Sequence, residues 1–447
     1  MGSLYIISGV TGMTGNELAR ELTSKDNLVV GFDNFFASSL KTVKDILDKD
    51  NFLFYNYDIN NHGDMEILRN EVLYLKNEYD KLIYINCAAV VHTEHFYHVD
   101  RTFETNVLGM KCFLEQAINV GADIYINCST SEVYSMHSWS DEGVKESDYI
   151  TLANAEHSQR TSYATGKLLT EFFMKDAVDE GRIKGCSIRF ANVYSKNELY
   201  PKHIIPHILR QLKEKGEVEL LENSKINKRT FLNNKDSCEA IIELINSQKA
   251  LDGTVYNVAT DEEISIIDLV YLCAEKLDIK NPKIIFKGYR ESDPKRRILN
   301  TDKIRKLTEW KPKITLDKGI EECIIELNKQ GGCMRENSFI KEKSAKYLYE
   351  DYYRKYINQI VEILEDISSR GGKIAIWGYG LKGIAFLNSL KGACKYISKI
   401  IDIKPELIGK KYKNKIEIID YSRIQNEKIT DIFIINGVFF VANTTHL

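Results

Sequence analysis

Tyr163 and Lys167 are the residues whose types and spacing point most directly to chemistry. They open a stretch with helical periodicity, and side chains at positions i and i+4 share one face of a helix. The lysine ammonium can therefore stabilise the phenolate of the tyrosine, which can then accept the proton of a substrate hydroxyl. The same spacing arises by chance in many helices, so the pair needs support from other parts of the sequence.

A cluster of hydroxyl and carboxyl side chains gives the first support. Thr130 follows a predicted strand at Asp123–Cys128, in the run Ser-Thr-Ser-Glu-Val-Tyr over positions 129–134. Ligands bind at the carboxyl ends of strands in open α/β sheets, so the Thr130 hydroxyl is a candidate partner of the same substrate oxygen. Glu132, two residues later, is a candidate base. Alternatively, these side chains cap a helix or stabilise a turn.

A glycine-rich turn, Gly9-Val10-Thr11-Gly12-Met13-Thr14-Gly15, joins the first predicted strand to a helix. Glycines let backbone N–H groups approach a pyrophosphate, and the helix N-terminus adds a favourable partial charge. Asp33 ends the second predicted strand, about twenty residues on, where a carboxylate can accept hydrogen bonds from an adenosine ribose. A carboxylate repels a 2′-phosphate, so NAD is favoured over NADP. Asp33 could instead be a turn residue.

The elements that must position these residues alternate along the first part of the chain. Short β-branched or aromatic runs are followed by longer segments of helical periodicity. The predicted strands are Leu4–Ser8, Leu28–Phe32, Phe52–Tyr55, Leu82–Asn86, Asp123–Cys128 and Gly185–Arg189, and the helical segments include Asn16–Thr23, Asp64–Leu75 and Phe103–Val120. This alternation predicts an α/β fold with a doubly wound parallel sheet of Rossmann type.

Changes in pattern suggest the domain organisation. We assign residues 1–193 to an NAD-binding Rossmann domain, to which a segment near 229–258 returns, and residues 194–330 to a smaller mixed substrate domain. The helical pieces of that second domain are Ile205–Glu214, Ser237–Ile245, Ile266–Leu277 and Leu316–Asn328. A linking helix is predicted over 338–370, followed by a small C-terminal α/β module over 371–447.

The C-terminal module begins with another strand, turn and helix. Lys373–Trp377 leads into a second G-x-G-x-x-G at 378–383, and a further predicted strand, Ile397–Ile401, ends in Asp402. This partial Rossmann-like pattern resembles the module at the C-terminus of some sugar C-methyltransferases. No methyltransferase domain precedes it here, so the likeness transfers no activity. We expect a packing or oligomerisation role, with a nucleotide site as the alternative.

Composition restricts the class of protein. The chain has 447 residues, 43% of them hydrophobic and 28% charged, which predicts a globular protein with a sizeable core. A net charge of −3 argues against a nucleic-acid partner, and no apolar run reaches the ~18 residues that span a bilayer. Nine cysteines without a C-x-x-C pair predict free thiols in a reducing cytoplasm. The nine histidines lack metal-ligand spacing, so we expect no metal, and His92 is interpreted as a loop residue.

Taken together, these motifs resemble the extended short-chain dehydrogenases/reductases, specifically the nucleotide-sugar epimerase/dehydratase family. The resemblance covers residues 3 to about 328. Besides the motifs above, it rests on Asp58, Cys87-Ala88-Ala89, Asn106 in Asn-Val-Leu-Gly, the run Arg-Phe-Ala-Asn-Val-Tyr over 189–194, Arg229-Thr230-Phe231 with Asp236, and Arg290-Glu291-Ser292-Asp293.

The resemblance implies a role for each matching residue. Tyr163 would be the base at the C4 hydroxyl of a nucleotide-diphosphate sugar, with Lys167 and Thr130 assisting it. NAD would be held by Gly9, Gly12, Met13, Thr14, Gly15, Asp33, Asn34, Asp58, Ile59, Ala88, Asn106 and Lys167. The substrate would be held by Ser131, Asn192, Arg229, Arg290 and Asp293, with the arginines on the diphosphate. A homodimer paired through the helix that carries Tyr163 is also implied.

The outcome after C4 oxidation is left open by the resemblance. Glu132 could remove the acidic C5 proton, and Thr130-Ser131-Glu132 is similar to the Thr-Ser-Glu of GDP-mannose 4,6-dehydratases and UDP-glucuronate decarboxylases. Other sugar dehydratases carry Asp where this chain has Ser131. We favour a 4,6-dehydratase, with a C4 epimerase, a uronate decarboxylase and a non-catalytic NAD-binding protein as alternatives. The chain departs from the usual family pattern at Ser135 and at Asn233-Asn234. These departures weaken any inference of the substrate's identity from the family.

Overall fold

A computed structural model gives the fold of the chain. It describes residues 2–330 except 93–97, 138–140, 159–160, 199 and 292, and residues 360–443 except 379–382, 384–385, 388–389, 403–404, 413–414 and 436–438. The chain divides into two compact units at residue 332. Each unit is built around its own sheet.

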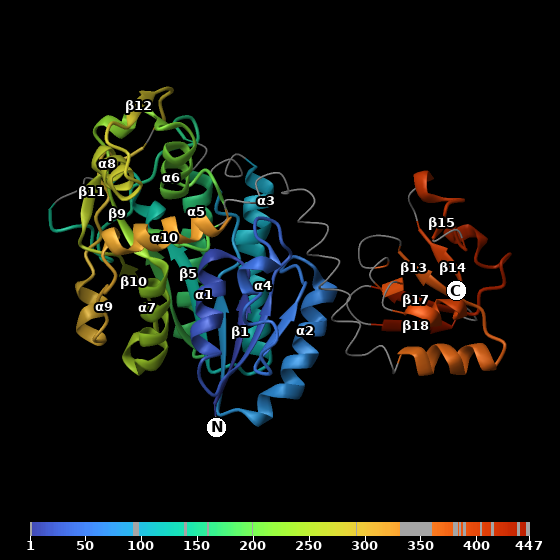
Figure 1. The fold of residues 1–447 in the computed structure, drawn as a ribbon. Helices are drawn as coiled ribbons and strands as arrows, with labels where there is room; N and C mark the ends of the chain where they lie inside the picture. Colours follow the sequence, from blue (N-terminus) through green and yellow to red (C-terminus); the bar gives the residue numbers. More distant parts are fainter. Residues whose placement is uncertain are drawn as a thin grey trace. The chain divides into compact units, whose positions relative to one another are not determined.

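Seven parallel strands form the sheet of the first unit, in the order β10-β6-β5-β4-β1-β2-β3 (Figure 1). The strands are β1 (Ser3–Ser8), β2 (Leu28–Phe32), β3 (Phe52–Tyr55), β4 (Lys81–Asn86), β5 (Ile124–Thr130), β6 (Lys184–Phe190) and β10 (Asp252–Val258). All six strands expected from the sequence are present, and the doubly wound α/β fold is confirmed. β10 lies at the end of the segment that was expected to return to this domain.

The strand order determines where the candidate site lies in the fold. From β1 the chain runs through β2 to β3 at one edge and then crosses back, so that β4 pairs with the other side of β1. Connections leave the carboxyl ends of β1 and β4 in opposite directions, and this divergence opens a crevice at the end of the sheet. Most candidate catalytic and cofactor residues follow a strand or lie in the first turns of a helix at this end; Asn106, inside a helical segment, is an exception.

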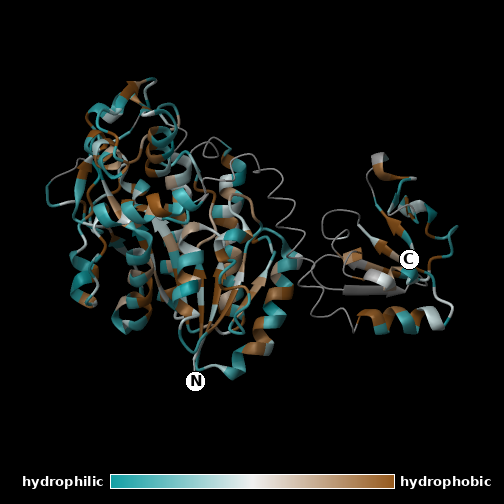
Figure 2. Ribbon diagram, viewed as in Figure 1, coloured by the Kyte–Doolittle hydropathy of each residue, from teal (hydrophilic) through white to brown (hydrophobic). Residues whose placement is uncertain are grey.

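Helices connect the strands and bury their apolar faces on the sheet, while the outer faces of the helices are hydrophilic (Figure 2). They are α1 (Met13–Leu22), α2 (His62–Leu75), α3 (Val99–Phe103), α4 (Met110–Asn119), α5 (Thr161–Asp179) and α7 (Asn234–Asn246). The core between strands and helices includes Ile6, Val30, Tyr84 and Phe113, each fully buried. Burial of this kind contributes about 1.5–3 kcal/mol for each large apolar side chain.

One predicted helix is interrupted. The sequence predicts a single helix over Phe103–Val120, but the structure inserts a π-helical turn, η4 (Glu104–Gly109), between α3 and α4. Single π-helical turns often occur at functional sites, because the extra residue redirects one side chain. Here Asn106, inside the turn, bonds both backbone groups of Val90, in the loop after β4.

The remainder of the first unit is a smaller mixed region. It contains β7 (Asn192–Tyr194), β8 (Glu217–Leu220), β9 (Lys228–Asn233), β11 (Glu263–Ser265), β12 (Lys283–Phe286), α6 (Ile204–Lys215), α8 (Ile266–Lys276), α9 (Asp302–Leu307) and α10 (Leu316–Gln330). Helices α6, α8 and α10 bury a shared apolar core that includes Leu209, Leu269 and Ile320. The chain enters this region through β7 and returns to the main sheet through β9, α7 and β10.

The second unit holds a six-stranded sheet in the order β15-β16-β14-β13-β17-β18. Its parallel strands are β13 (Ile374–Trp377), β14 (Ile397–Ile401), β16 (Ile416–Ile419) and β17 (Asp431–Ile435), and the edge strands β15 (Lys411–Tyr412) and β18 (Phe439–Asn443) are antiparallel. Residues 360–369 of the predicted linking helix are helical. Its part at 338–359 and positions 379–382 of the second glycine motif lie outside the described residues.

Candidate active site

Two cavities meet at the carboxyl end of the seven-stranded sheet. The first, about 590 Å³, lies over the glycine turn and the ends of β1, β2, β4 and β5. The second, about 580 Å³, lies between this end of the sheet and the smaller mixed region. Thr130 and Tyr163 line both cavities. We call them the cofactor cavity and the sugar cavity, after the ligands that the sequence leads us to expect.

Backbone atoms of the glycine turn form one wall of the cofactor cavity. Gly9 has φ +67°, and a Cβ added there would lie 2.7 Å from the backbone nitrogen of Ala88. A Cβ at Gly15 would lie 2.3 Å from the carbonyl oxygen of Gly9. Only glycine fits these two positions without displacing backbone. Gly12, Met13 and Thr14 line the same wall at the start of α1.

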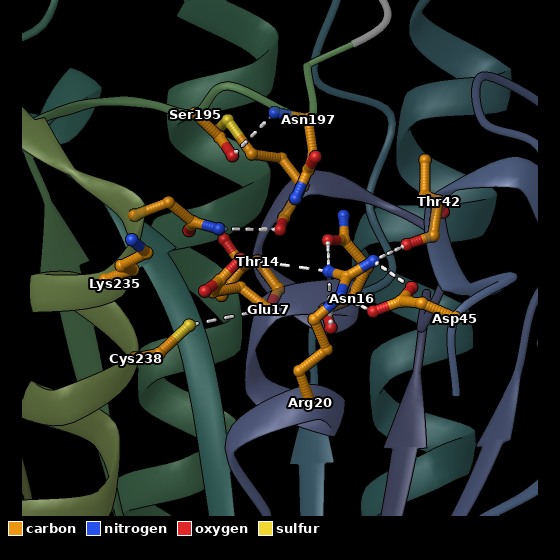
Figure 3. A network of polar contacts seen from close by, with 12 residues as sticks. Thr14, Asn16, Glu17, Arg20, Thr42, Asp45, Ser195, Asn197, Lys235 and Cys238 are labelled. Carbon is orange, nitrogen blue, oxygen red and sulfur yellow. Dashed lines mark hydrogen bonds and ion pairs between the residues drawn. The ribbon is translucent and has the colours of Figure 1, made fainter. Parts of the chain in front are cut away.

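The glycine turn is anchored through helix α1, as Figure 3 shows. On one side, the Cys238 thiol of α7 contacts the carbonyl oxygen of Thr14 at 3.6 Å. On the other, Arg20 forms two hydrogen bonds with Asp45, of 2.7 and 2.8 Å, and a third with the side chain of Asn16. Asn16 in turn donates to the carbonyl oxygen of Gly12 at 2.6 Å. The start of α1 is therefore held from both sides.

Asp33 lies at the end of β2 and lines the cofactor cavity. Its carboxylate accepts hydrogen bonds from the backbone nitrogens of Thr11 (3.2 Å) and Phe35 (2.8 Å) and from the Ser38 hydroxyl (3.1 Å). Burial raises the pKa of Asp33, and these hydrogen bonds oppose that effect. Nearby, the Asn34 amide donates to the Asp58 carboxylate at 2.9 Å.

The remaining candidate cofactor residues divide into two groups. Asn34, Asp58, Ile59 and Ala88 line the cofactor cavity. Asn106 does not line it and is completely buried. Because Asn106 bonds the backbone of Val90 at 2.7 and 3.1 Å, it holds the loop that forms part of the cavity wall.

The candidate catalytic residues converge where the cavities meet. Tyr163 and Lys167 stand on the first turns of α5, both buried, and Thr130 ends β5. The Lys167 ammonium donates to the carbonyl oxygen of Cys128 at 2.8 Å, and burial lowers the pKa of Lys167. The Thr130 hydroxyl accepts from the backbone nitrogen of Glu132 at 3.2 Å, which makes Thr130 also the cap of a short 3-10 turn. The functional and capping interpretations of Thr130 are thus compatible.

Glu132 lines the sugar cavity in a two-point ion pair with Arg297. Nη1 and Nη2 of Arg297 donate to the two carboxylate oxygens at 2.8 and 3.3 Å. Arg297 itself is only 4% exposed, and within the described part of the chain its Nε has no hydrogen-bond partner. Ser131 is buried and lines neither cavity. The Glu132 carboxylate therefore lines the sugar cavity, whereas the hydroxyl of the neighbouring Ser131 does not.

A second ion pair in the sugar cavity joins Arg229 of β9 to Asp293 at 3.1 Å. The Asn227 amide also donates to Asp293, at 2.6 Å, so the carboxylate holds both side chains in place. Burial and the neighbouring Arg297 lower the pKa of Arg229 to about 10. Arg290 and Asn192 line the same cavity, and the Asn192 amide bonds the carbonyl oxygen of Thr230 at 3.2 Å.

Sequence reasoning missed several residues at this site. Arg297 is the most important, because no local pattern distinguishes it from Arg296, which pairs with Glu263 and Asp141 and lines neither cavity. A second group borders the cofactor cavity: the rings of His92 and Tyr200 stack 3.7 Å apart, and His203 contacts both rings and pairs with Glu198. The isolated histidines carried no spacing signal that would have identified this group.

The cofactor cavity suits a dinucleotide. The glycine wall admits close approach of a pyrophosphate to the start of α1, and Asp33 offers a carboxylate at the end of β2. For a metal ion, the described residues contain no group of three or more His, Cys, Asp or Glu side chains that could act as ligands. Among the same residues, no helix combines the length and hydrophobicity needed to cross a bilayer.

Comparison with known proteins agrees with this architecture. The family model described as GDP-mannose 4,6 dehydratase matches residues 6–323. UDP-glucuronic acid decarboxylase 1 of Danio rerio is 25% identical over 346 residues, which are 76% of each chain. The dTDP-D-glucose 4,6-dehydratase of Dictyostelium discoideum is 27% identical over 270 residues, 59% of this chain and 60% of that protein.

Solved structures share the fold of the first unit. The UDP-glucose 4-epimerase of Thermotoga maritima superposes with a TM-score of 0.64 at 20% identity, covering 73% of this chain and 99% of that one. The dTDP-glucose 4,6-dehydratase of Streptomyces venezuelae, solved with NAD bound, has a TM-score of 0.65 at 18% identity and covers 74% and 99%. With the family match over residues 6–323, these findings show that the chain belongs to the extended short-chain dehydrogenase/reductase family of NAD-dependent nucleotide-sugar epimerases and dehydratases.

Proposed function

We propose that the chain oxidises C4 of a nucleotide-diphosphate hexuronate and then removes its C6 carboxylate, as a nucleotide-sugar decarboxylase. The observation that carries this proposal is the buried Arg297, which faces the sugar cavity beside Glu132. A guanidinium is suited to a carboxylate, and Arg297 lines the sugar cavity into which the C6 carboxylate of a hexuronate would reach. The curated relatives named UDP-glucuronic acid decarboxylase support the same choice.

The first step takes place at the junction of the two cavities. Tyr163 accepts the proton of the C4 hydroxyl, while the Thr130 hydroxyl bonds the same oxygen and orients the sugar. Lys167, held by the carbonyl oxygen of Cys128, keeps a positive charge near the phenolate. NAD, held by the residues of the cofactor cavity, would supply the two-electron oxidant at C4 and later the reductant, so no other oxidant would be needed.

The second step follows from the chemistry of the oxidised sugar. A ketone at C4 makes a C6 carboxylate part of a β-keto acid, so the C5–C6 bond can break with release of carbon dioxide. The electron pair of that bond passes to the C4 oxygen, which Thr130 and the protonated Tyr163 stabilise as an enolate. A proton from water then adds to C5, and Glu132, which lines the cavity, would orient that water. Before the C5–C6 bond breaks, Arg297 holds the C6 carboxylate of the substrate. Its positive charge offsets the negative charges of this carboxylate and of Glu132.

A 4,6-dehydratase, which the sequence alone favoured, is the second candidate because Glu132 lines the sugar cavity. That reaction must protonate the departing C6 hydroxyl. Ser131 stands where some sugar dehydratases carry an acid and GDP-mannose 4,6-dehydratases carry the same serine, and here it is buried outside both cavities. Glu132 would have to act as both base and acid while paired with a guanidinium. The dehydratase is placed second because its neutral hexose substrate would offer no carboxylate to Arg297.

Product mass distinguishes these reactions. Purified protein would be incubated in deuterated water with UDP-glucuronate, GDP-mannose and dTDP-glucose. Loss of carbon dioxide from the uronate, with one deuterium gained at C5, is the expected result. Loss of water from a neutral hexose would make the chain a dehydratase, and a new isomer of unchanged mass would make it an epimerase.

Two neighbouring arginines test the role of Arg297. We expect Arg297→Met to stop carbon dioxide release while C4 oxidation continues, so that NADH absorbance accumulates in the presence of the uronate. Arg296→Met is the matched control, since Arg296 lines neither cavity. Equal carbon dioxide release by both variants would remove Arg297 from the mechanism.

A further inference from the structure

Two cysteines lie side by side in the wall of the cofactor cavity. Cys87 directly follows β4, and Cys128 lies in β5. Asn86 pairs with Asn127 in the register of these parallel strands, so the next positions, Cys87 and Cys128, are lateral neighbours. Their sulfur atoms are 3.9 Å apart. Both residues are half-buried, and both line the cavity.

The two thiols differ in their electrostatic surroundings. The contact with Cys87 and the charge of Lys167 lower the pKa of Cys128, whereas the same contact and burial raise that of Cys87. Lys167 reaches this place because its ammonium bonds the carbonyl oxygen of Cys128 at 2.8 Å. A cysteine beside a cation and in contact with a second thiol is the arrangement of an attacking and a resolving cysteine.

The backbone geometry permits a covalent bond between them. Neighbouring strands lie about 4.7–4.9 Å apart, which falls within the Cα separations of roughly 4.4–6.8 Å found across disulfides. Rotation of the two side chains is then enough to bring the sulfur atoms from 3.9 Å to bonding distance.

We propose that Cys87 and Cys128 form a reversible disulfide that switches off cofactor binding when a peroxide enters the cavity. The Cys128 thiolate attacks one peroxide oxygen, the O–O bond breaks, and the other oxygen leaves as water after taking a proton. The Cys87 sulfur then displaces the oxygen of the resulting sulfenic acid, which also leaves as water. Two thiols are oxidised by two electrons, hydrogen peroxide is reduced to two waters, and a small thiol reverses the change.

The disulfide would affect Lys167, on which the nicotinamide end of the site depends. It removes the negative charge beside Lys167 and rotates the Cys128 side chain within the wall of the cofactor cavity. Bound NAD would in turn cover both sulfur atoms, because they line the cavity that the dinucleotide fills. Oxidation and NAD binding should therefore exclude each other.

Peptide mapping tests the first part of this proposal. The full chain would be treated with hydrogen peroxide, with and without prior saturation by NAD, then alkylated and digested without reduction. We expect a cross-linked peptide pair containing Cys87 and Cys128 in the unprotected sample and at least a tenfold lower yield with NAD. Cys112→Ser, which removes an exposed thiol, should behave as the unmodified chain. Absence of the cross-link, or equal yields with and without NAD, would overturn the proposal.

NAD titration of the oxidised protein tests the second part. We expect an affinity loss of about tenfold or more, the effect of disturbing one charged contact, with recovery after dithiothreitol. Cys87→Ser and Cys87→Ala should each form no cross-link and regain full NAD affinity after reduction, each compared with its own untreated sample. A cross-linked protein that binds NAD as well as the reduced one would refute the switch. This outcome is independent of which sugar the enzyme uses.

Discussion

The cofactor cavity and the sugar cavity have nearly equal volumes, about 590 and 580 Å³, but they are built differently. The wall of the first is largely backbone from one turn and from loops after strands, fixed by steric contacts at Gly9 and Gly15. The second is lined by charged side chains in pairs, Glu132 with Arg297 and Arg229 with Asp293. Shape therefore dominates on the cofactor side and charge on the sugar side. The two sides should respond to different kinds of substitution.

The largest effect is expected at Tyr163, which lines both cavities. Tyr163→Phe should lower turnover by about 10²–10⁴-fold, the usual contribution of a positioned acid–base group, while NAD and substrate still bind. Steady-state kinetics and NAD titration measure the two effects separately. Tyr149→Phe is the control, since Tyr149 is almost fully exposed. A comparable loss of NAD affinity in Tyr163→Phe would mean that the residue belongs to the cofactor side alone.

On the cofactor side, a single methyl group should be enough to disturb binding. Gly15→Ala places a carbon 2.3 Å from the Gly9 carbonyl oxygen, and the displacement costs about 1–3 kcal/mol. NAD affinity should then fall roughly 10- to 100-fold in a titration. Gly392→Ala has open space around its Cβ and should change nothing. Normal NAD affinity in Gly15→Ala would show that this wall does not hold the dinucleotide.

On the sugar side, loss of a charge should raise KM rather than lower turnover. Arg229→Gln removes a guanidinium from the cavity, and a hydrogen bond to a charged group is worth about 1.5–3 kcal/mol. We expect KM for the nucleotide sugar to rise roughly tenfold or more with kcat nearly unchanged. Arg69→Gln, on an exposed pair with Glu66, is the control. A rise in the Kd for NAD instead would contradict the division between the two cavities.

The smallest effect is expected at Asp33, a charged group that should help the cofactor side to recognise its ligand. Asp33→Asn keeps the shape of the side chain and removes its charge, so NAD affinity should fall only about three- to tenfold. The preference for NAD over NADP should narrow at the same time, because repulsion of a 2′-phosphate is lost. Binding assays with both dinucleotides measure this. An unchanged preference would assign the discrimination to another residue.

Much of the fold could be predicted from the sequence because its signals are local. Six of the seven strands of the main sheet were predicted from short β-branched or aromatic runs, whereas β10, with the sequence DGTVYNV, was not. The glycine turn is one contiguous segment whose spacing directly reflects its geometry. Tyr163 and Lys167 were identified for the same reason, since helical periodicity alone places them on one face. The interrupted helix around Asn106 was missed, because a π-helical turn has no pattern of its own in a single sequence.

The sequence by itself determined the parallel sheet, the glycine wall of the cofactor cavity and the residues at the end of β5, because each depends on neighbours within a few positions. Only the tertiary structure paired Glu132 with Arg297, 165 positions away along the chain, and Cys87 with Cys128, 41 positions away. It also excluded Ser131 from the cavities that Glu132 and Thr130 line. These pairings, and the exclusion of Ser131, depend on how segments distant in the sequence pack together. Packing determines which carboxylate lies beside which cation.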